Sequence, residues 1–151
     1  MKRIGFLGVV AAGAAGVLIA RPSTAASQVI EVYKEPTCGC CGKWIEHVRA
    51  SGFVARVNEV RSVDALKAQV GLPSALASCH TALIDGYVIE GHVPAADIRQ
   101  LLAERPKARG LAVPGMPAIA PGMDGTHGPG YKVLLFQADG TTQVYHAYPG
   151  I

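Results

Sequence analysis

The chain has 151 residues, half of them hydrophobic, which is enough apolar content for the core of one ordinary domain. Of its 14 basic and 11 acidic side chains, three basic ones (Lys2, Arg3 and Arg21) lie within the first 26 residues. The rest of the chain is therefore electrically balanced, which excludes the basic surface that a nucleic-acid partner or an anionic membrane would require.

Residues 1–26 have the composition of a cleavable export signal. A basic start at Lys2 and Arg3 is followed by an apolar run over residues 4–20 and by small residues at 23–26. The run is nearly long enough to remain as a membrane anchor, but its many Gly and Ala residues and its small-residue exit favour cleavage. We therefore expect a signal peptide at 1–26 and one exported domain at 27–151, with no membrane association after removal.

The remaining chain alternates between strand and helix patterns. Alternating β-branched residues predict strands at 29–33 and 53–60, and an apolar face that includes Trp44 predicts a helix at about 41–51. Ser62 is a suitable N-cap for a short helix that runs through Val70, and one helical turn is expected within 74–80.

The second half begins with a predicted hairpin, 81–84 and 87–90, across the turn Asp85-Gly86. Pro94 suits the first turn of the next helix. Residues 110–130 are rich in Pro and Gly and are predicted to form one long irregular loop. A second hairpin is expected from 131–136 and 143–148. This order predicts an α/β thioredoxin-like domain with an added C-terminal β-hairpin.

Three of the four cysteines lie within four positions, at Cys38, Cys40 and Cys41, where a strand leads into a helix N-terminus. This location favours thiolates. Adjacent cysteines have Cα atoms about 3.8 Å apart, below the usual disulfide range of roughly 4.4 Å upward, whereas Cys38 and Cys41 can pair. Cys40 would then compete in every exchange reaction. The pattern therefore fits a soft metal ion better than a simple dithiol enzyme.

Cys79 and His80 precede the third predicted strand, which the predicted fold places beside the three-cysteine turn. His92, just before a helix, is a candidate ligand or a residue that supports one, with a surface or helix-capping position as the alternative. Met116 and Met123 lie in Pro-Gly turns rather than on a helical face, and thiolates with thioethers select Cu(I). Both methionines could instead serve only as hydrophobic packing.

The other histidines have weaker claims to a metal. His127 lies in the flexible loop near Met123 and is a possible accessory ligand. His47 is about 10 Å from Cys40 by helix rise, too far to share a metal ion. We expect His146 to be structural and Trp44 to lie in the core.

The stretches TCGCCGKW, SCHTALIDGYVIEGHVPAADI, GLAVPGMPAIAPGM and YKVLLF resemble a family of small exported copper-binding proteins. This family has a thioredoxin-like fold and a C-x-C-C motif, is associated with bacterial copper resistance, and was long catalogued as a domain of unknown function. The resemblance covers nearly the whole exported chain. It implies copper binding by the residues Cys38, Cys40, Cys41, Cys79, His80, His92, Met116 and Met123, and a coupling between copper redox state and thiol oxidation.

The sequence thus predicts a periplasmic protein that binds Cu(I), as a sulfur-bridged cluster, for copper sequestration, transfer or Cu(I)/Cu(II) conversion. Its partners would be copper ions and other copper-handling proteins of the periplasm. Two alternatives stay open: a thiol–disulfide oxidoreductase that uses Cys38 and Cys41, and a structural zinc site with four cysteines. Whether the protein turns over as a copper or thiol oxidoreductase is left open by the sequence.

Overall fold

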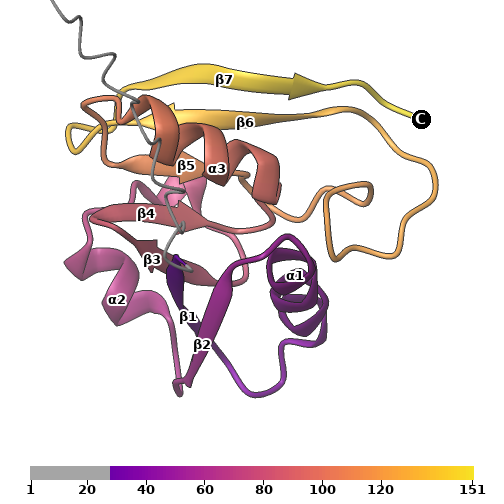
Figure 1. Cartoon of the computed structure of the whole chain (residues 1–151), viewed down its shortest axis with the longest axis horizontal. Coiled ribbons are helices and arrows are strands. Elements are labelled where there is room, and N and C mark those ends of the chain that lie inside the picture. The colour runs from indigo at the N-terminus through magenta and orange to yellow at the C-terminus, as the bar shows by residue number, and fades with distance from the viewer. Residues whose placement is uncertain (1–27) are drawn as a thin grey trace, which may run out of the picture.

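The computed structural model describes residues 28–151, so the export signal predicted at 1–26 lies outside the described residues. Figure 1 shows helices packed on a twisted sheet. In chain order the elements are β1 (Val29–Lys34), α1 (Gly39–Ala50), β2 (Val54–Glu59), α2 (Asp64–Gln69), the 3-10 helix η1 (Ser74–Leu76), β3 (Thr81–Ile84), β4 (Tyr87–Glu90), α3 (Ala95–Glu104), β5 (Gly110–Ala112), β6 (Tyr131–Phe136) and β7 (Thr142–Tyr148). Within residues 28–151, none of the helices has the length and apolar character needed to cross a bilayer.

The strands form one seven-stranded sheet in the order β2-β1-β3-β4-β5-β6-β7. Strand β1 pairs parallel with β2 and antiparallel with β3, and β3 pairs antiparallel with β4. Together with α1, α2 and α3, these four strands have the order predicted for a thioredoxin-like domain. Strands β6 and β7 form the added hairpin at the far edge of the sheet. The predicted α/β class and the C-terminal hairpin are confirmed.

Strand β5 corrects the prediction of an unbroken loop at 110–130. Its three residues pair parallel with β4 and antiparallel with β6, and so join the hairpin to the rest of the sheet. A Cβ atom at Gly110 would overlap the backbone of Val88. The glycine that suggested a loop is therefore required by the close approach of two strands. Three residues are also too few to show the two-residue alternation of a strand.

Two helix starts differ from the predicted ones. Helix α1 begins at Gly39, two residues early, so that Cys40 and Cys41 lie inside its first turn. Helix α2 begins at Asp64 with Val63 as its N-cap. Ser62, the predicted cap, still accepts a hydrogen bond from the Asp64 N–H at 3.2 Å.

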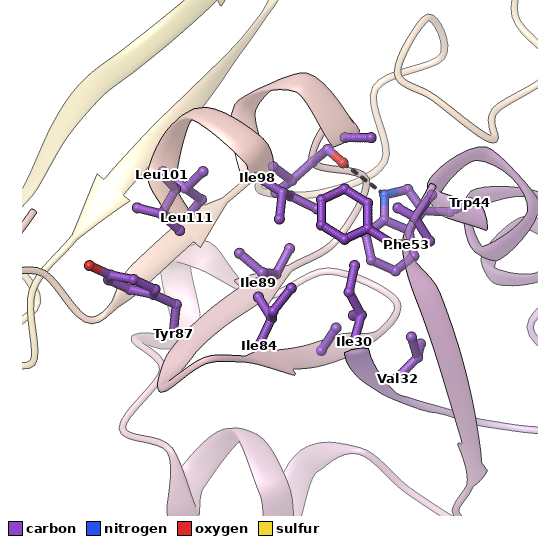
Figure 2. Packing of buried hydrophobic residues seen from close by; sticks show 14 of the residues in the cluster. Ile30, Val32, Trp44, Phe53, Ile84, Tyr87, Ile89, Ile98, Leu101 and Leu111 are labelled. Carbon is purple, nitrogen blue, oxygen red and sulfur yellow. Dashed lines mark hydrogen bonds between the residues drawn. The ribbon is translucent and has the colours of Figure 1, made fainter. Parts of the chain in front are cut away.

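The two faces of the sheet carry separate hydrophobic clusters. Helices α1 and α3 cover one face, where Trp44, Phe53 and Ile98 pack on Ile30 and Ile89 (Figure 2). Helix α2 and η1 flank the other face, where a smaller cluster consists of Val70, Leu76, Val88, Ala112 and Phe136. Trp44 is fully buried, as predicted, and its Nε1–H donates to the Val93 carbonyl at 2.9 Å. This bond ties the middle of α1 to the segment that leads into α3.

The added hairpin is fastened to α3 through a buried carboxylate. Asp97 accepts hydrogen bonds from His146 Nδ1 and from the Tyr148 hydroxyl, each at 2.9 Å. A bulge between Val133 and Leu134 interrupts the register opposite this part of β7. His146 thus has a structural contact of its own.

Candidate metal centre

The N-terminus of α1 carries three of the four cysteines. Cys38 is the N-cap residue, and Cys40 and Cys41 follow in the first turn. The first amide groups of a helix lack partners within the helix and carry its positive dipole end, so they stabilise thiolate ligands. Cys41 is fully buried, whereas Cys38 and Cys40 are half-buried. The turn thus presents sulfur atoms both inward and toward the surface.

Cys38 and Cys41 form a disulfide, and Cys40 and Cys79 are free thiols. The Cα atoms of the bonded pair are 5.5 Å apart, within the ordinary range. The Sγ atom of Cys40 lies 3.7 Å from that of Cys38 and 3.8 Å from that of Cys79. Cys40 therefore lies between the disulfide and the fourth cysteine, where it can take part in exchange. The structure describes an oxidised form of the site, two electrons short of four thiols.

Cys79 reaches this turn from another part of the chain. It lies just before β3, and β3 is hydrogen-bonded to β1, the strand that leads into α1. The Sγ atoms of Cys38, Cys40, Cys41 and Cys79 all lie within 4.8 Å of one another. The sheet thus assembles the four-cysteine group that the sequence predicted.

Cys79 also belongs to a second group. Its Sγ atom lies 3.3 Å from Nδ1 of His80 and 3.1 Å from Nε2 of His92. The three residues offer ligand atoms within 4.8 Å of one another. His80 leads into β3 and His92 follows β4, so the hairpin holds both rings beside the thiol. Cys79 is the residue common to both groups.

The tautomer of His92 follows from its contacts. Its Nδ1 lies 2.7 Å from the Pro121 carbonyl, which can only accept, so Nδ1 carries the proton. Nε2 therefore presents its lone pair toward Cys79. Histidine ligands in metal sites have this arrangement, with the second nitrogen donating to a carbonyl or carboxylate. Burial lowers the pKa of His92, which keeps the ring neutral.

His80 is completely buried and packs against Trp44, with ring centroids 4.4 Å apart and the ring planes tilted by 45°. Burial, and then the charges of His92 and Lys67, lower the pKa of His80 to about 3. Among the residues that the structure describes, nothing hydrogen-bonds to its Nε2. A buried nitrogen without a partner is costly, and a bound ion or water would supply the missing contact. The grouped cysteine and histidine donors, with Nδ1 of His80 facing Cys79, fit a metal ion.

The thiol of Cys79 is protonated in this form. Burial, and then the neighbouring Cys40, raise the pKa of the Cys79 thiol to about 12. Thiolate is the form that binds metal, so metal binding here must release a proton.

The two methionines lie differently from the cysteines and histidines. Met116 is 54% exposed and lines an open cavity of about 550 Å³ with Pro117 and Tyr131. Met123 is half-buried and follows Gly122, which packs against the backbone of Trp44. The structure brings the loop of Met123 beside the site and leaves Met116 at the surface. Their roles as ligands stay predictions.

The remaining histidines are occupied elsewhere or exposed. His47 Nε2 accepts a hydrogen bond from the Ala95 N–H at 3.0 Å, and so caps the start of α3. His127 is exposed, with Nδ1 3.0 Å from the Thr126 hydroxyl. Its accessory role at the metal also stays a prediction.

Sequence reasoning missed a buried ionic group beside Cys79, made of Lys67, Thr81 and Glu90. Lys67 Nζ contacts the carboxylate of Glu90 and donates to the Thr81 hydroxyl at 2.9 Å. One signal was available. The predicted hairpin register places Thr81 directly opposite Glu90, and a charged residue ends an otherwise apolar strand.

The comparisons with known proteins agree with this geometry. Residues 76–123 match a family described as "Protein of unknown function, DUF411". Two solved structures, titled "Copper resistance protein copG", Form 1 and Form 2, are each 42% identical to this chain. The first covers 83% of this chain and 100% of its own, with a TM-score of 0.78, and the second covers 82% and 100%, with a TM-score of 0.76. Among curated proteins, none matches. Residues 76–123 of this chain include Cys79, His80 and His92. This chain belongs to the family of the copper resistance protein copG.

Proposed function

We propose that this protein binds Cu(I) in the periplasm and serves in copper resistance by sequestering copper, passing it on or interconverting Cu(I) and Cu(II). The thiolates of Cys38, Cys40, Cys41 and Cys79 would be the main ligands. The observation that carries the proposal is the double membership of Cys79, whose Sγ atom joins the cysteine group to the two histidines. A sulfur that faces two sets of ligands suits a bridged cluster of more than one copper ion.

The softness of the ligands supports copper. The two groups contain four sulfur atoms and two neutral imidazoles, and neither group, as found among residues 28–151, includes a carboxylate. Such a set disfavours Mg²⁺ and Ca²⁺ and favours Cu(I) or zinc. The thioethers of Met116 and Met123, if they join the site, would favour Cu(I) further, because zinc gains little from them.

The disulfide supports a link between copper and thiol redox states. Reduction of the Cys38–Cys41 bond to two thiolates consumes two electrons. Two Cu(I) ions supply these electrons when they become two Cu(II) ions. In the reverse direction, two Cu(II) ions accept the electrons and the disulfide forms. Cys40 and Cys79 would hold copper while this exchange takes place.

The export signal predicted at residues 1–26 supports the periplasm as the place of action. In that oxidising compartment a free dithiol tends to become a disulfide, which is the state found for Cys38 and Cys41. Other copper-handling proteins of the periplasm would then be the donors or acceptors of the metal.

A thiol–disulfide oxidoreductase is the second candidate. The observation in its favour is the Cys38–Cys41 disulfide at a helix N-terminus. Thiol–disulfide oxidoreductases have their active-site disulfide at the same position. The variant Cys40→Ser separates the two functions. Copper affinity should fall if Cys40 is a ligand, whereas a dithiol enzyme should keep or gain activity once the competing sulfur is removed. Unchanged copper affinity would favour the enzyme.

The main test is a metal competition. The exported domain is fully reduced and handled without air, then titrated with Cu(I) against a chromogenic Cu(I) chelator, with and without excess zinc. We expect tight Cu(I) binding that zinc does not displace. The variant Cys79→Ser, which removes the shared sulfur, should lose most of the affinity. Displacement of copper by comparable zinc would contradict the proposal.

A further inference from the structure

The carboxylate of Glu90 is buried at the back of the metal site. Glu90 and Thr81 are fully buried and Lys67 is 8% exposed. One oxygen, Oε1, accepts the backbone N–H of Ser78 at 2.7 Å and contacts Lys67 Nζ. The other, Oε2, accepts the hydroxyl of Thr81 at 2.7 Å. The two carboxylate oxygens therefore accept hydrogen bonds from two different residues of the adjacent segment, Ser78 and Thr81.

These two residues lie on either side of two candidate ligands in the sequence. Ser78 immediately precedes Cys79, and Thr81 immediately follows His80. One carboxylate thus holds both ends of the Cys79–His80 dipeptide. We call this arrangement the Glu90 clamp. It follows from the hairpin register, which pairs Thr81 with Glu90 across β3 and β4.

The next residue in the chain strengthens the clamp. The Gly91 N–H donates to the His80 carbonyl at 3.0 Å. A Cβ atom at Gly91 would overlap the side chain of Ser78 and the carbonyl of Val113. Only glycine allows this approach, and His92 follows directly. The clamp therefore connects Cys79, His80 and His92 through the last residue of β4, Glu90, and the glycine that follows it.

Burying a carboxylate and an ammonium group is energetically unfavourable compared with packing apolar side chains in the same volume. Removing both charges from water is strongly unfavourable, and well-packed apolar residues often stabilise a fold as well or better. An apolar pair, however, would leave the Ser78 N–H without an acceptor and would not hold the dipeptide. The presence of Glu90 and Lys67 at this buried position is therefore explained by the hydrogen bonds of Glu90 to Ser78 and Thr81 rather than by a gain in stability.

We propose that Glu90 is a positioning residue of the copper site, which acts through Ser78 and Thr81 to hold Cys79 and His80 in place. The inference rests on the proposed function, since it takes copper to be the cargo. Residues that orient ligands in this way typically change metal affinity about 10–100-fold when they are replaced.

Two pairs of variants test the clamp. Glu90→Leu combined with Lys67→Met removes the acceptor and both charges together, whereas Glu90→Gln combined with Lys67→Met keeps an oxygen for the Ser78 N–H. Thr81→Val removes the hydroxyl, and Thr81→Ser retains it. The control is Ile84→Val, which shortens a buried side chain at the other end of the same strand as Thr81 without touching the clamp.

Each variant is examined in two ways. Cu(I) affinity is measured by chelator competition on the reduced protein. The alkylation rate of Cys79 is measured without metal by mass spectrometry of tryptic peptides, which separates Cys79 from the other three cysteines because Lys43, Arg49 and Arg61 lie between them in every variant. Unfolding curves accompany both measurements.

We expect the Leu/Met and Val variants to lose about tenfold or more in Cu(I) affinity and to alkylate Cys79 faster. The Gln/Met and Ser variants should recover most of both properties.

Wild-type values in the Leu/Met and Val variants would overturn the inference, as would an equal affinity loss in Ile84→Val at equal stability. If reduced wild-type protein bound no Cu(I), the proposed function would fail, and the alkylation rates alone would decide whether Glu90 holds the dipeptide. Should the Leu/Met variant not fold, the Thr81 pair decides.

Discussion

The tripeptide Pro-Gly-Met occurs twice in the long loop, at 114–116 and at 121–123, with very different surroundings. Both glycines have positive φ, +68° at Gly115 and +82° at Gly122. A Cβ atom would meet nothing within 4 Å at Gly115, but would overlap the backbone of Trp44 at Gly122. The same local sequence thus serves as an open turn in one copy and as a tight contact with α1 in the other.

The two copies also support different sides of the metal site. Gly115 donates its N–H to the Ala77 carbonyl at 3.2 Å and accepts the Ser78 hydroxyl, so the first copy borders the chain that leads to Cys79. Pro121 accepts from His92, so the second copy determines which nitrogen of that ring faces the thiol. Figure 1 shows the loop passing beside α1 on its way to β6. Similar turns can therefore differ in function because of what each backbone touches.

The largest expected difference between the copies concerns their glycines. Gly122→Ala adds a clash with the Trp44 backbone to the strain of positive φ, and should cost about 2–5 kcal/mol of unfolding free energy. Gly115→Ala adds strain alone, about 1–2 kcal/mol. Denaturant unfolding of the reduced, metal-free variants measures both values. Equal losses would mean that the second copy is not packed against α1.

The methionines should differ by less. Met123→Leu should lower Cu(I) affinity about tenfold, or 1.4 kcal/mol, because the second copy already lies against the site. Met116→Leu should have a smaller effect, and both variants should keep the fold, since this swap usually costs under about 1.5 kcal/mol. Chelator competition and copper release rates provide the measurement. Identical copper binding in the wild type and in the variant that carries both substitutions would show that the two methionines only pack against their neighbours and do not bind copper.

A smaller effect on stability is expected from the protonation of His47. Its ring caps α3 by accepting the N–H of Ala95, a residue that lies three positions after His92. Burial lowers the pKa of His47, so the unfolded chain binds its proton more readily than the folded one. The contribution of His47 to stability is therefore complete above the unfolded pKa, about 6.5, and declines as the pH falls below it.

His47→Gln should flatten the decline, since an amide oxygen can accept the Ala95 N–H without titrating. Part of the decline should persist, because burial also lowers the pKa values of His80 and His92. The comparison needs unfolding curves of both proteins between pH 5 and 8. A variant with the wild-type pH dependence would show that the cap at α3 does not depend on the neutral ring.

The smallest effect should come from the ion pair between Lys43 and Asp124, which also joins the second copy to α1. Both side chains are more than half exposed, and such pairs contribute about 0–1 kcal/mol. Asp124→Asn should therefore change neither stability nor copper affinity measurably, in contrast to Gly122→Ala. A loss as large as that of Gly122→Ala would mean that the surface charge, rather than the backbone contact, holds the loop.

The parts of this molecule that follow from the sequence are those with a strong local cause. Residues Thr81–Ile84 and Tyr87–Glu90 form the predicted hairpin because Asp85-Gly86 suits a turn in which both residues have positive φ. The four cysteines meet because this hairpin pairs with β1. The role of each of these donors as a metal ligand stays a prediction.

The parts that the sequence did not predict depend on contacts between distant segments. The three residues of β5 become a strand only because β4 and β6 lie on either side of them. The Glu90 clamp needs Lys67 from α2, which no local pattern connects to β4. The two Pro-Gly-Met copies have the same local sequence, so nothing in their residues could distinguish the open turn from the packed one.

The contact between the Trp44 and His80 rings gives the protein an optical reporter of its own. Trp44 is the chain's single tryptophan, so all indole fluorescence comes from this one position. The ring lies 4.4 Å from the His80 ring, and its Nε1–H is bonded to Val93 (Figure 2). A copper ion bound by His80 would change the surroundings of this indole. Emission from unlabelled protein should therefore follow copper arrival and departure in real time, without any dye or tag.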